Sequence, residues 1–204
     1  MAKSRRAEVH GISRKFDRFF KVDEIDVAHE GYDGAMRREQ RLVFERGDAV
    51  AVLLYDPASK EVIVLEQFRA PVLVARRRND PQTSDGWIVE AVAGMIDEGE
   101  TPEQAVIREA LEETGYRIAT PRAINTFFSS PGGTSERIFL FFAEVSAADR
   151  TGAGGCIAGE EDIALVRLNT DELFRRLDNS QIEDPKLAIA AYWLRGYLAR
   201  TASR

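Results

Sequence analysis

The 204-residue sequence has only one cysteine, Cys156, and two histidines, His10 and His29. A disulfide within the chain is therefore impossible, and zinc sites built from cysteine and histidine are nearly excluded. The shortage of histidine also argues against a Ser–His–Asp catalytic triad. A catalytic metal would have to be held mainly by carboxylates, which favours hard cations such as Mg²⁺ or Mn²⁺.

The sequence also lacks long apolar runs and an excess of positive charge. No stretch is long enough to span a membrane, and the basic N-terminus (Lys3, Arg5, Arg6) is not followed by the apolar segment of a signal peptide. We therefore expect a cytoplasmic protein with no membrane partner. The net charge of -6 makes polymeric nucleic acid an unfavourable partner, although a bound metal could still attract small phosphates.

The composition, 44% hydrophobic and 30% charged, is typical of a globular domain. Alternating or continuous apolar residues predict strands, and turn residues separate them. The expected strands lie at 16–31 (one or two), 35–46, 50–55, 61–68, 87–92, 122–128, 137–145 and 163–168. Residues 75–86 are expected to form a loop, and Trp87, Phe127 and Phe128 to lie in the core. Together with helices, this order predicts an α+β fold with a mixed sheet.

Three helices are expected, at 102–114, 170–177 and 186–200. The first has the clearest end signals. Thr101 and Gln104 have the spacing of a capping box, Pro102 suits the first helical position, and Gly115 can end the helix. Thr170 is the expected cap of the second helix, and Pro185 precedes the third.

The helix at 102–114 carries a cluster of glutamates. Glu109 and Glu113 are one turn apart on one face, and Glu112 lies beside them. Clustered like charges destabilise a helix, and a bound cation would relieve the repulsion. Taken alone, such a cluster is more often a solvated face. The glycines, Glu100 and Arg108 around it make that interpretation much weaker.

Residues 94–116 resemble the signature of the Nudix family. The signature has Gly, five residues, Glu, seven residues, Arg-Glu, an apolar residue, any residue, Glu-Glu, any residue, Gly and an apolar residue. The sequence matches from Gly94 through Glu100, Arg108-Glu109 and Glu112-Glu113 to Gly115. The one departure is Tyr116, where Ile, Leu or Val is usual.

The resemblance implies a loop–helix–loop on an α/β/α sandwich and hydrolysis that depends on Mg²⁺, with Mn²⁺ as a possible substitute. Glu109 and Glu113 resemble the main metal ligands, joined by Glu112 and the carbonyl of Ala93. Arg108 and Glu100 resemble positioning residues, since arginine can hold carboxylates through charge-assisted hydrogen bonds.

Most of the chain, roughly residues 35–198, resembles the ADP-ribose pyrophosphatase subgroup. The matching segments are Phe44–Gly47, Glu66–Arg69, Ser130–Glu136 and Glu160–Ile163. Members of this subgroup are usually domain-swapped homodimers. The resemblance thus implies an N-terminal β-rich dimerisation arm at 1–46 and a catalytic domain at 47–204.

The same resemblance implies which residues contact the substrate. Arg69 matches an arginine that binds phosphates or the terminal ribose, and Arg41 matches one that reaches the neighbouring subunit's substrate. The Ser-Pro-Gly-Gly turn with Gly133, followed by Glu136, is expected to line the substrate cleft. Without the resemblance, Ser-Pro-Gly-Gly would be interpreted only as a tight turn, because its residues favour turns.

A further carboxylate is expected from the segment after the glycine-rich residues 152–159. Aligned through Asp162-Ile163, Glu161 matches a metal-ligand position, whereas the position often used as general base is Gly159. Either Glu160 or Glu161 could take the role of the base.

The expected reaction is hydrolysis of a nucleoside diphosphate sugar, first of all ADP-ribose to AMP and ribose 5-phosphate. The main alternative is a GDP-mannose-type hydrolase, because close relatives share Ser-Pro-Gly-Gly. A nucleotide-sugar-binding regulator without turnover is the third hypothesis, which the intact Glu109, Glu112 and Glu113 disfavour.

Overall fold

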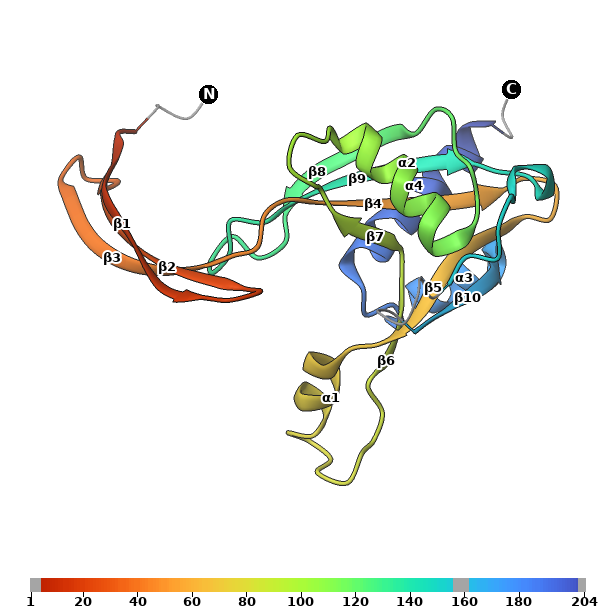
Figure 1. Ribbon diagram of the computed structural model, residues 1–204, viewed down its shortest axis with the longest axis horizontal. Helices are drawn as coiled ribbons and strands as arrows, with labels where there is room; N and C mark the ends of the chain where they lie inside the picture. Colours follow the sequence, from red (N-terminus) through yellow and green to blue (C-terminus); the bar gives the residue numbers. More distant parts are fainter. Residues whose placement is uncertain (1–4, 156–161, 202–204) are drawn as a thin grey trace. The chain divides into compact units, whose positions relative to one another are not determined.

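A computed structural model describes residues 5–155 and 162–201. The chain forms two compact units, which are described separately. One comprises residues 1–48 and 127–137, and the other comprises 49–126 and 138–204. The elements are labelled in Figure 1. No helix in the described part of the chain is both long and apolar enough to cross a membrane.

The first unit contains a three-stranded antiparallel sheet. Its strands are β1 (Ala7–Asp17), β2 (Lys21–Glu30) and β3 (Met36–Glu45), in the spatial order β1-β2-β3. The sequence did not predict β1, because its residues are exposed along the whole strand and its apolar residues do not alternate regularly. The segment Ser130–Glu136 belongs to the same unit and pairs with Phe44 at the end of β3 through Thr134.

The second unit is built on a mixed seven-stranded sheet with the order β10-β5-β4-β9-β8, to which β6 adds beside β5 and β7 beside β4. The strands are β4 (Ala49–Asp56), β5 (Glu61–Phe68), β6 (Trp87–Glu90), β7 (Val92–Met95), β8 (Arg122–Phe128), β9 (Arg137–Glu144) and β10 (Ile163–Asn169). β4 and β9 pair in parallel, whereas β4 and β5 form the expected antiparallel hairpin. The predicted α+β class with a mixed sheet is confirmed.

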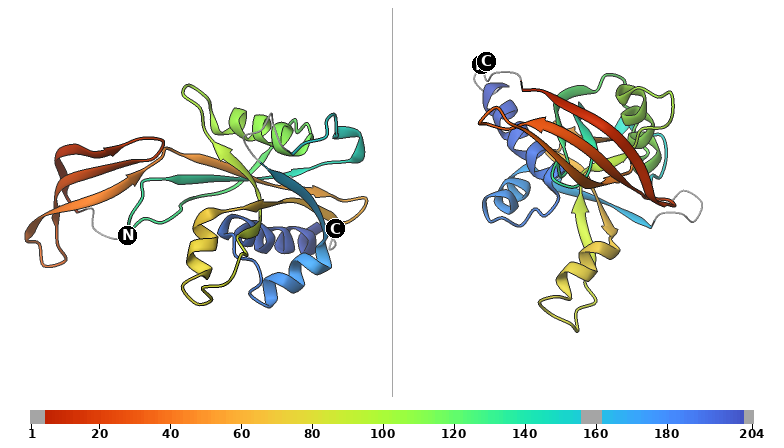
Figure 2. Two further views of the ribbon diagram at one scale, coloured as in Figure 1. Left: turned by 60° about the horizontal axis from the view of Figure 1, so that its bottom comes forward. Right: turned by 90° about the vertical axis from the view of Figure 1, so that its left-hand side faces the viewer.

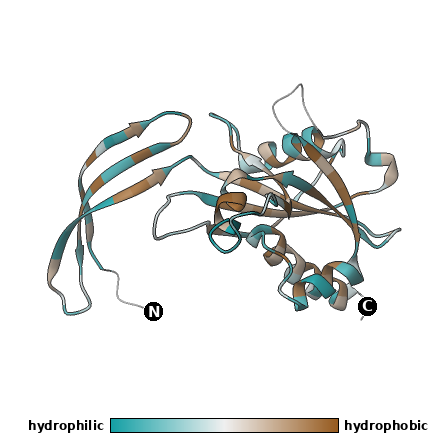
Figure 3. Ribbon diagram, turned by 90° about the horizontal axis from the view of Figure 1, so that it is seen from below, coloured by the Kyte–Doolittle hydropathy of each residue, from teal (hydrophilic) through white to brown (hydrophobic). Residues whose placement is uncertain are grey.

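Helices cover both faces of this sheet, as Figure 2 shows. On one face lies α2 (Pro102–Thr114), and on the other lie α3 (Thr170–Asp178) and α4 (Pro185–Thr201). β4 is buried along its whole length between the two layers, which explains its continuous apolar sequence. Figure 3 shows the apolar residues concentrated in the strands between the helical layers.

Several local predictions were wrong. The predicted strand 87–92 is two short strands, because the chain leaves β5 after Glu90 and pairs with β4 from Val92 onward. A helix, α1 (Ala70–Arg76), begins before the predicted loop and extends into it. The cap of α3 is Asn169, whose side chain accepts a hydrogen bond from the Asp171 backbone, whereas Thr170 is buried.

Two aromatic residues expected in the core are also exposed. Trp87 is 52% and Phe128 53% accessible. Both lie on short or peripheral strands, so the apolar character of these residues did not indicate burial.

Candidate active site

Helix α2 begins and ends where its sequence predicts. Thr101 Oγ1 accepts from the Gln104 backbone at 3.3 Å, and Gln104 Oε1 accepts from the Thr101 backbone at 2.9 Å, which completes the capping box. Gly115 ends the helix with a left-handed φ of 74°. Ala105, Val106 and Ala110 are fully buried, so the helix has a fixed base on the sheet.

Arg108 is the centre of the polar network on this helix. Its Nε and Nη2 donate to the two oxygens of Glu100 at 3.1 and 2.9 Å, and Nη2 also donates to the Met95 carbonyl at 3.0 Å. Nη1 donates to Glu109 at 2.7 Å and to Glu112 at 3.2 Å. All three guanidinium nitrogens therefore donate hydrogen bonds. These bonds fix the loop before α2 relative to Glu109 and Glu112 on the helix.

The charges of this network stabilise each other. The hydrogen bond to Glu100 is the main cause that raises the pKa of the Arg108 guanidinium, despite its partial burial. In return, the same bond holds the pKa of the Glu100 carboxyl below its ordinary value. Both groups therefore stay ionised at neutral pH, and Glu100 fixes one side of Arg108 permanently.

Strand β7 contacts the two glutamates that are one turn apart on α2. Glu113 is only 8% exposed, and its Oε2 accepts from the Ala93 backbone N–H at 3.1 Å. A Cβ atom added at Gly94 would lie 1.9 Å from Oε1 of Glu109. Position 94 therefore needs glycine, because any side chain would displace the Glu109 carboxylate.

The donor set fits a hard divalent cation in its chemistry. Glu109, Glu112 and Glu113 offer only oxygen ligands, and the absence of a Cβ at Gly94 leaves room for the Glu109 carboxylate beside the strand. Within the described ranges, no three or more acidic, histidine or cysteine side chains are arranged as a preformed ion site, so binding a cation requires these carboxylates to reorient. Glu160 and Glu161, the further carboxylates expected from the sequence, lie outside the described residues.

The end of α2 contacts the start of the glycine-rich segment. The Gly155 N–H donates to the Glu113 carbonyl at 2.6 Å, and the Thr151 N–H donates to the Gly115 carbonyl at 2.8 Å. A Cβ at Gly154 would lie 2.3 Å from the Thr114 carbonyl carbon, so this close approach requires glycine. The chain that leads toward Glu160 thus starts from a fixed position beside Glu113.

Tyr116, the departure from the signature, is accommodated in the core. The residue is 1% exposed, and its hydroxyl accepts a hydrogen bond from Nη1 of Arg167 at 2.8 Å. A buried tyrosine needs such a partner for its hydroxyl, and Arg167 on β10 provides it. The departure therefore concerns the packing behind the helix and leaves its glutamates unchanged.

Arg69 lies at the start of α1, in the same unit as α2. Its backbone N–H donates to the Gly86 carbonyl at 2.8 Å, and its Nε donates to Oε2 of Glu90 at 2.7 Å. The side chain is 42% exposed. Of the expected substrate residues, Arg69 is thus the one in the unit that also carries Glu109 and Glu113.

Arg41, Gly133 and Glu136 lie in the other unit. Glu136 is 8% exposed, with Nε of Arg46 at 3.2 Å from its Oε1. The Gly133 carbonyl accepts from the Phe44 backbone at 2.8 Å, which ties the Ser-Pro-Gly-Gly turn to β3. Arg41 on β3 is mostly exposed and pairs with Glu39. Gly133 and Glu136 lie three residues apart in the segment beside Phe44, whereas Arg41 lies in the middle of β3, opposite Ile25 of β2.

The sequence interpretation missed Glu90, Asp184 and Lys186, which connect to Arg69. One signal was available: Asp184 stands directly before Pro185, the pattern of a helix cap followed by proline at the first position. Nothing in the sequence pointed to Glu90 or Lys186, because their partners are remote along the chain.

The chain is similar to known proteins along most of its length. A model of the NUDIX domain matches residues 45–187, which include all of α2 and the segments around it. The ADP-ribose pyrophosphatase of Escherichia coli (strain K12) is 35% identical over 178 residues, covering 86% of this chain and 81% of that protein.

Two proteins with a different name are about equally similar. The GDP-mannose pyrophosphatase of Cronobacter sakazakii (strain ATCC BAA-894) is 37% identical over 173 residues, covering 85% of this chain and 86% of that protein. The GDP-mannose pyrophosphatase of Escherichia coli O1:K1 / APEC is 32% identical over 178 residues, covering 87% and 89%. The domain match and the similarity along most of each chain show that this protein belongs to the Nudix hydrolase family, whose members generally need a divalent metal.

Proposed function

We propose that this protein hydrolyses the diphosphate of a nucleotide sugar, with ADP-ribose as the first candidate substrate and Mg²⁺ as the cofactor. Water adds to one phosphorus, the bond from that phosphorus to the bridging oxygen breaks, and AMP and ribose 5-phosphate leave. The observation that carries the proposal is the pair Glu109 and Glu113, which lie against Ala93 and Gly94 of one strand. Relatives named ADP-ribose pyrophosphatase support the substrate class.

The roles proposed for these residues combine the family resemblance with the contacts of Arg108. Glu109, Glu113 and Glu112 would hold Mg²⁺, with the Ala93 carbonyl as a further oxygen donor. When bound, the metal neutralises diphosphate charge and lowers the pKa of a bound water. Arg108 keeps Glu109 and Glu112 oriented through hydrogen bonds of 2.7 and 3.2 Å. Reorganisation of these carboxylates during the reaction is thereby limited.

The remaining assignments rest on resemblance. Arg69 would bind the substrate phosphates, and Gly133 and Glu136 would line the cleft. Glu160 or Glu161 would supply the last carboxylate, as a metal ligand or general base. Mn²⁺ would replace Mg²⁺ because both prefer oxygen ligands.

A GDP-mannose-type hydrolase is the second candidate. The observation in its favour is the 37% identity to the Cronobacter sakazakii protein of that name, against 35% for the Escherichia coli ADP-ribose pyrophosphatase. Both candidates break the same kind of bond, so the acidic helix does not discriminate between them.

The experiment that decides is a substrate panel. Purified protein with Mg²⁺ is offered ADP-ribose, GDP-mannose and other nucleotide sugars, and kcat/KM is measured for each. We expect ADP-ribose to give the highest kcat/KM, with AMP and ribose 5-phosphate as products. A higher value for GDP-mannose would replace the first candidate with the second, and hydrolysis of none of them would refute both.

We also propose a homodimer formed through the N-terminal arm, residues 1–46. Apolar side chains of its sheet are exposed, among them Val9 at 62%, Ile12 at 65% and Leu42 at 61%. Exposed apolar residues gathered on one small sheet favour burial against a partner. Analytical ultracentrifugation should give twice the 22.8 kDa chain mass, and a mass near 22.8 kDa would contradict the proposal.

A further inference from the structure

A chain of four alternating charges runs from the exposed side chain of Arg69 into the interior of the second unit. Nε of Arg69 donates to Oε2 of Glu90 at 2.7 Å. Oε1 of Glu90 lies 3.5 Å from Nζ of Lys186, which in turn donates to Oδ1 of Asp184 at 2.8 Å. These four side chains are two cations and two anions, and their net charge is zero.

The two ends of this series differ most in burial. The side chain of Arg69 is 42% exposed, those of Glu90 and Lys186 are 12% and 18% exposed, and that of Asp184 is 1% exposed. The inner end is fixed to the backbone of two elements. Asp184 accepts from the Lys186 and Leu187 backbones at the start of α4, and from the Ala91 N–H between β6 and β7 at 3.0 Å.

The outer end is left open. The two Nη atoms of Arg69 donate no hydrogen bond to any residue within 5–155 or 162–201, whereas its Nε and its backbone N–H are both held. A guanidinium held through Nε presents its two Nη atoms as a fork, a geometry suited to a phosphate or carboxylate. Buried ion pairs contribute little net stability, so orientation is a better explanation of the inner three charges.

The same strand segment leads to the acidic helix. Glu90 is three residues before Ala93, whose N–H binds Glu113, so their Cα atoms are at most about 10 Å apart. Asp184 holds Ala91 between them. Glu90, which binds Arg69, and Ala93, which binds Glu113, therefore belong to one fixed segment. The distance between them is comparable to the length of a diphosphate and its sugar.

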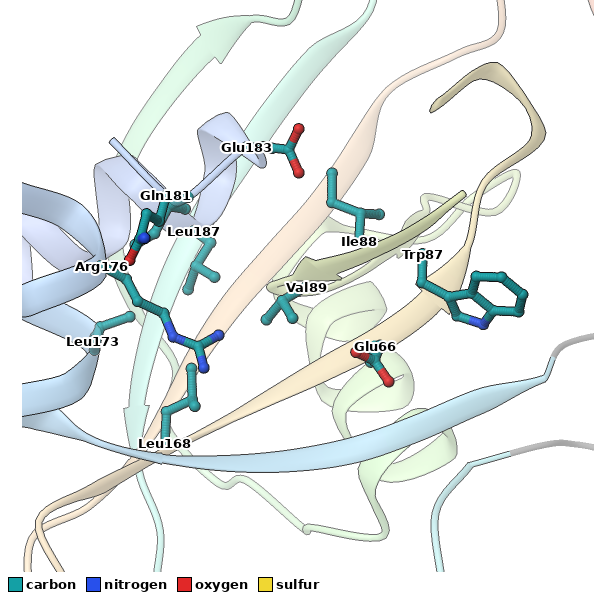
Figure 4. Close-up of a pocket in the computed structure, with 11 residues that line it drawn as sticks. Glu66, Trp87, Ile88, Val89, Leu168, Leu173, Arg176, Gln181, Glu183 and Leu187 are labelled. Atoms are coloured by element: carbon teal, nitrogen blue, oxygen red, sulfur yellow. The ribbon is translucent and has the colours of Figure 1, made fainter. Parts of the chain in front are cut away.

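The packing beneath β6 leaves a cavity. A cavity of about 130 Å³ lies between β6 and helices α3 and α4 (Figure 4). Ile88 and Val89 of β6 line it, together with Leu173 of α3 and Leu187 of α4. A cavity of this size holds several waters, so on this side β6 is held by its pairing with β5 and by the polar contacts of the β6–β7 junction.

We propose that Glu90 and Lys186 are positioning residues for Arg69, and that together they orient its guanidinium toward the diphosphate of the substrate. Asp184 fixes Lys186 and the β6–β7 junction from the inside. This inference rests on the proposed function, since it concerns how that site holds its substrate.

The test is a double-mutant cycle on kcat/KM for ADP-ribose with Mg²⁺. Glu90→Gln removes the charge that holds Arg69 with little change of volume, and Arg69→Ala removes the group that is held. We expect Glu90→Gln to lower kcat/KM roughly 10- to 100-fold in the natural background. In the Arg69→Ala background it should change kcat/KM less than about twofold, because no guanidinium remains to be oriented.

Lys186 gives the conservative rescue. Lys186→Met should lower kcat/KM roughly tenfold, whereas Lys186→Arg, which keeps a cation beside Glu90, should restore most of it. Arg76→Met is the matched control. Arg76 also holds β6, through the Trp87 carbonyl at 3.2 Å and Glu183 at 2.5 Å, but it contacts neither Arg69 nor Glu90. It should lower Tm and leave kcat/KM within about threefold of the natural protein.

The outcomes separate this inference from the proposed function. If the natural protein hydrolyses ADP-ribose but Glu90→Gln costs the same factor with and without Arg69, the positioning role is wrong and the function stands. The positioning role is also wrong if Arg76→Met lowers kcat/KM as much as Glu90→Gln. If the natural protein hydrolyses no nucleotide sugar, the proposed function is wrong and the inference is wrong with it.

Discussion

Two arginines in the second unit contact glutamates in different ways. Arg108 donates through all three nitrogens, to Glu100, Glu109, Glu112 and the Met95 carbonyl, and is 28% exposed. Arg69 donates through Nε alone, to Glu90, and is 42% exposed. A guanidinium that donates through all three nitrogens holds its neighbours in place. One that donates through Nε alone is oriented, and its two Nη atoms can still bind a ligand.

The largest effect should come from removing the glutamate that accepts the Ala93 N–H. Glu113→Gln removes a charged oxygen donor beside Ala93, and we expect kcat to fall roughly 10³-fold, because several kcal/mol of transition-state stabilisation by the metal would be lost. Glu103→Gln on the exposed first turn of α2 is the matched control and should retain full activity. Equal activity of the two variants would show that Glu113 has no part in catalysis.

Gly94→Ala is a smaller change, which tests the contact between the Glu109 carboxylate and β7. The added Cβ would lie 1.9 Å from Oε1 of Glu109, the mobile end of a long side chain, so the carboxylate should move and the fold should survive. We expect Tm to stay close to that of the natural protein and kcat/KM to fall roughly 10²-fold, as displacements of about 1 Å can cause.

The control for that change is Gly196→Ala in α4, where the added Cβ approaches only the Arg200 side chain, at 3.2 Å. Alanine is favoured over glycine inside a helix, so this variant should be fully active and no less stable. Full activity of Gly94→Ala would show that the position of Glu109 beside β7 does not matter.

Asp184 tests the inner end of the Arg69 chain through stability. Asp184→Ala removes the cap of α4 and leaves the buried Ala91 N–H without its acceptor, so the free energy of unfolding should fall by about 1–3 kcal/mol. Asp184→Asn keeps an acceptor oxygen and should lose clearly less. Urea denaturation measures the free energy of unfolding of both variants. Equal losses would mean that the negative charge of Asp184 matters and that its hydrogen bonds to the α4 backbone and to Ala91 do not.

The smallest effect concerns pH and the Arg108 network. Arg108 holds the pKa of Glu100 below its ordinary value of 4.5 in the folded state. A lowered pKa stabilises the fold fully above pH 4.5, and this contribution is lost as the pH falls through the folded-state pKa. The natural protein should therefore be more stable than Glu100→Gln at neutral pH, and the difference should shrink below pH 4.5. A constant difference would contradict this account of Glu100.

The comparison also explains what the sequence could predict. The contacts of Arg108 lie within residues 94–116, and the helical repeat fixes which of these side chains share a face. The capping residues Thr101 and Gln104 and the buried strand β4 were predictable for the same reason, since their signals are local. Asn169 was missed as a cap because Thr170 beside it has the same capping chemistry.

The contacts of Arg69 could not be predicted in this way. Glu90 and Lys186 come from a strand and a helix far along the chain, and only the folded sheet brings them together. The split between β6 and β7 was hidden because residues 87–92 are apolar enough for one strand, although the partner strand changes after Glu90. Exposure of Trp87 likewise depends on the arrangement of its neighbours, which composition does not encode.

We propose above that the acidic helix α2 and its neighbouring strand β7 support hydrolysis of a diphosphate. The most direct measurement is a ³¹P NMR time course of ADP-ribose with the natural protein and Mg²⁺, with Glu113→Gln run in parallel. With the natural protein alone, we expect the two diphosphate signals to be replaced by the phosphomonoester signals of AMP and ribose 5-phosphate. Unchanged diphosphate signals for ADP-ribose, and then for every nucleotide sugar tried, would contradict it.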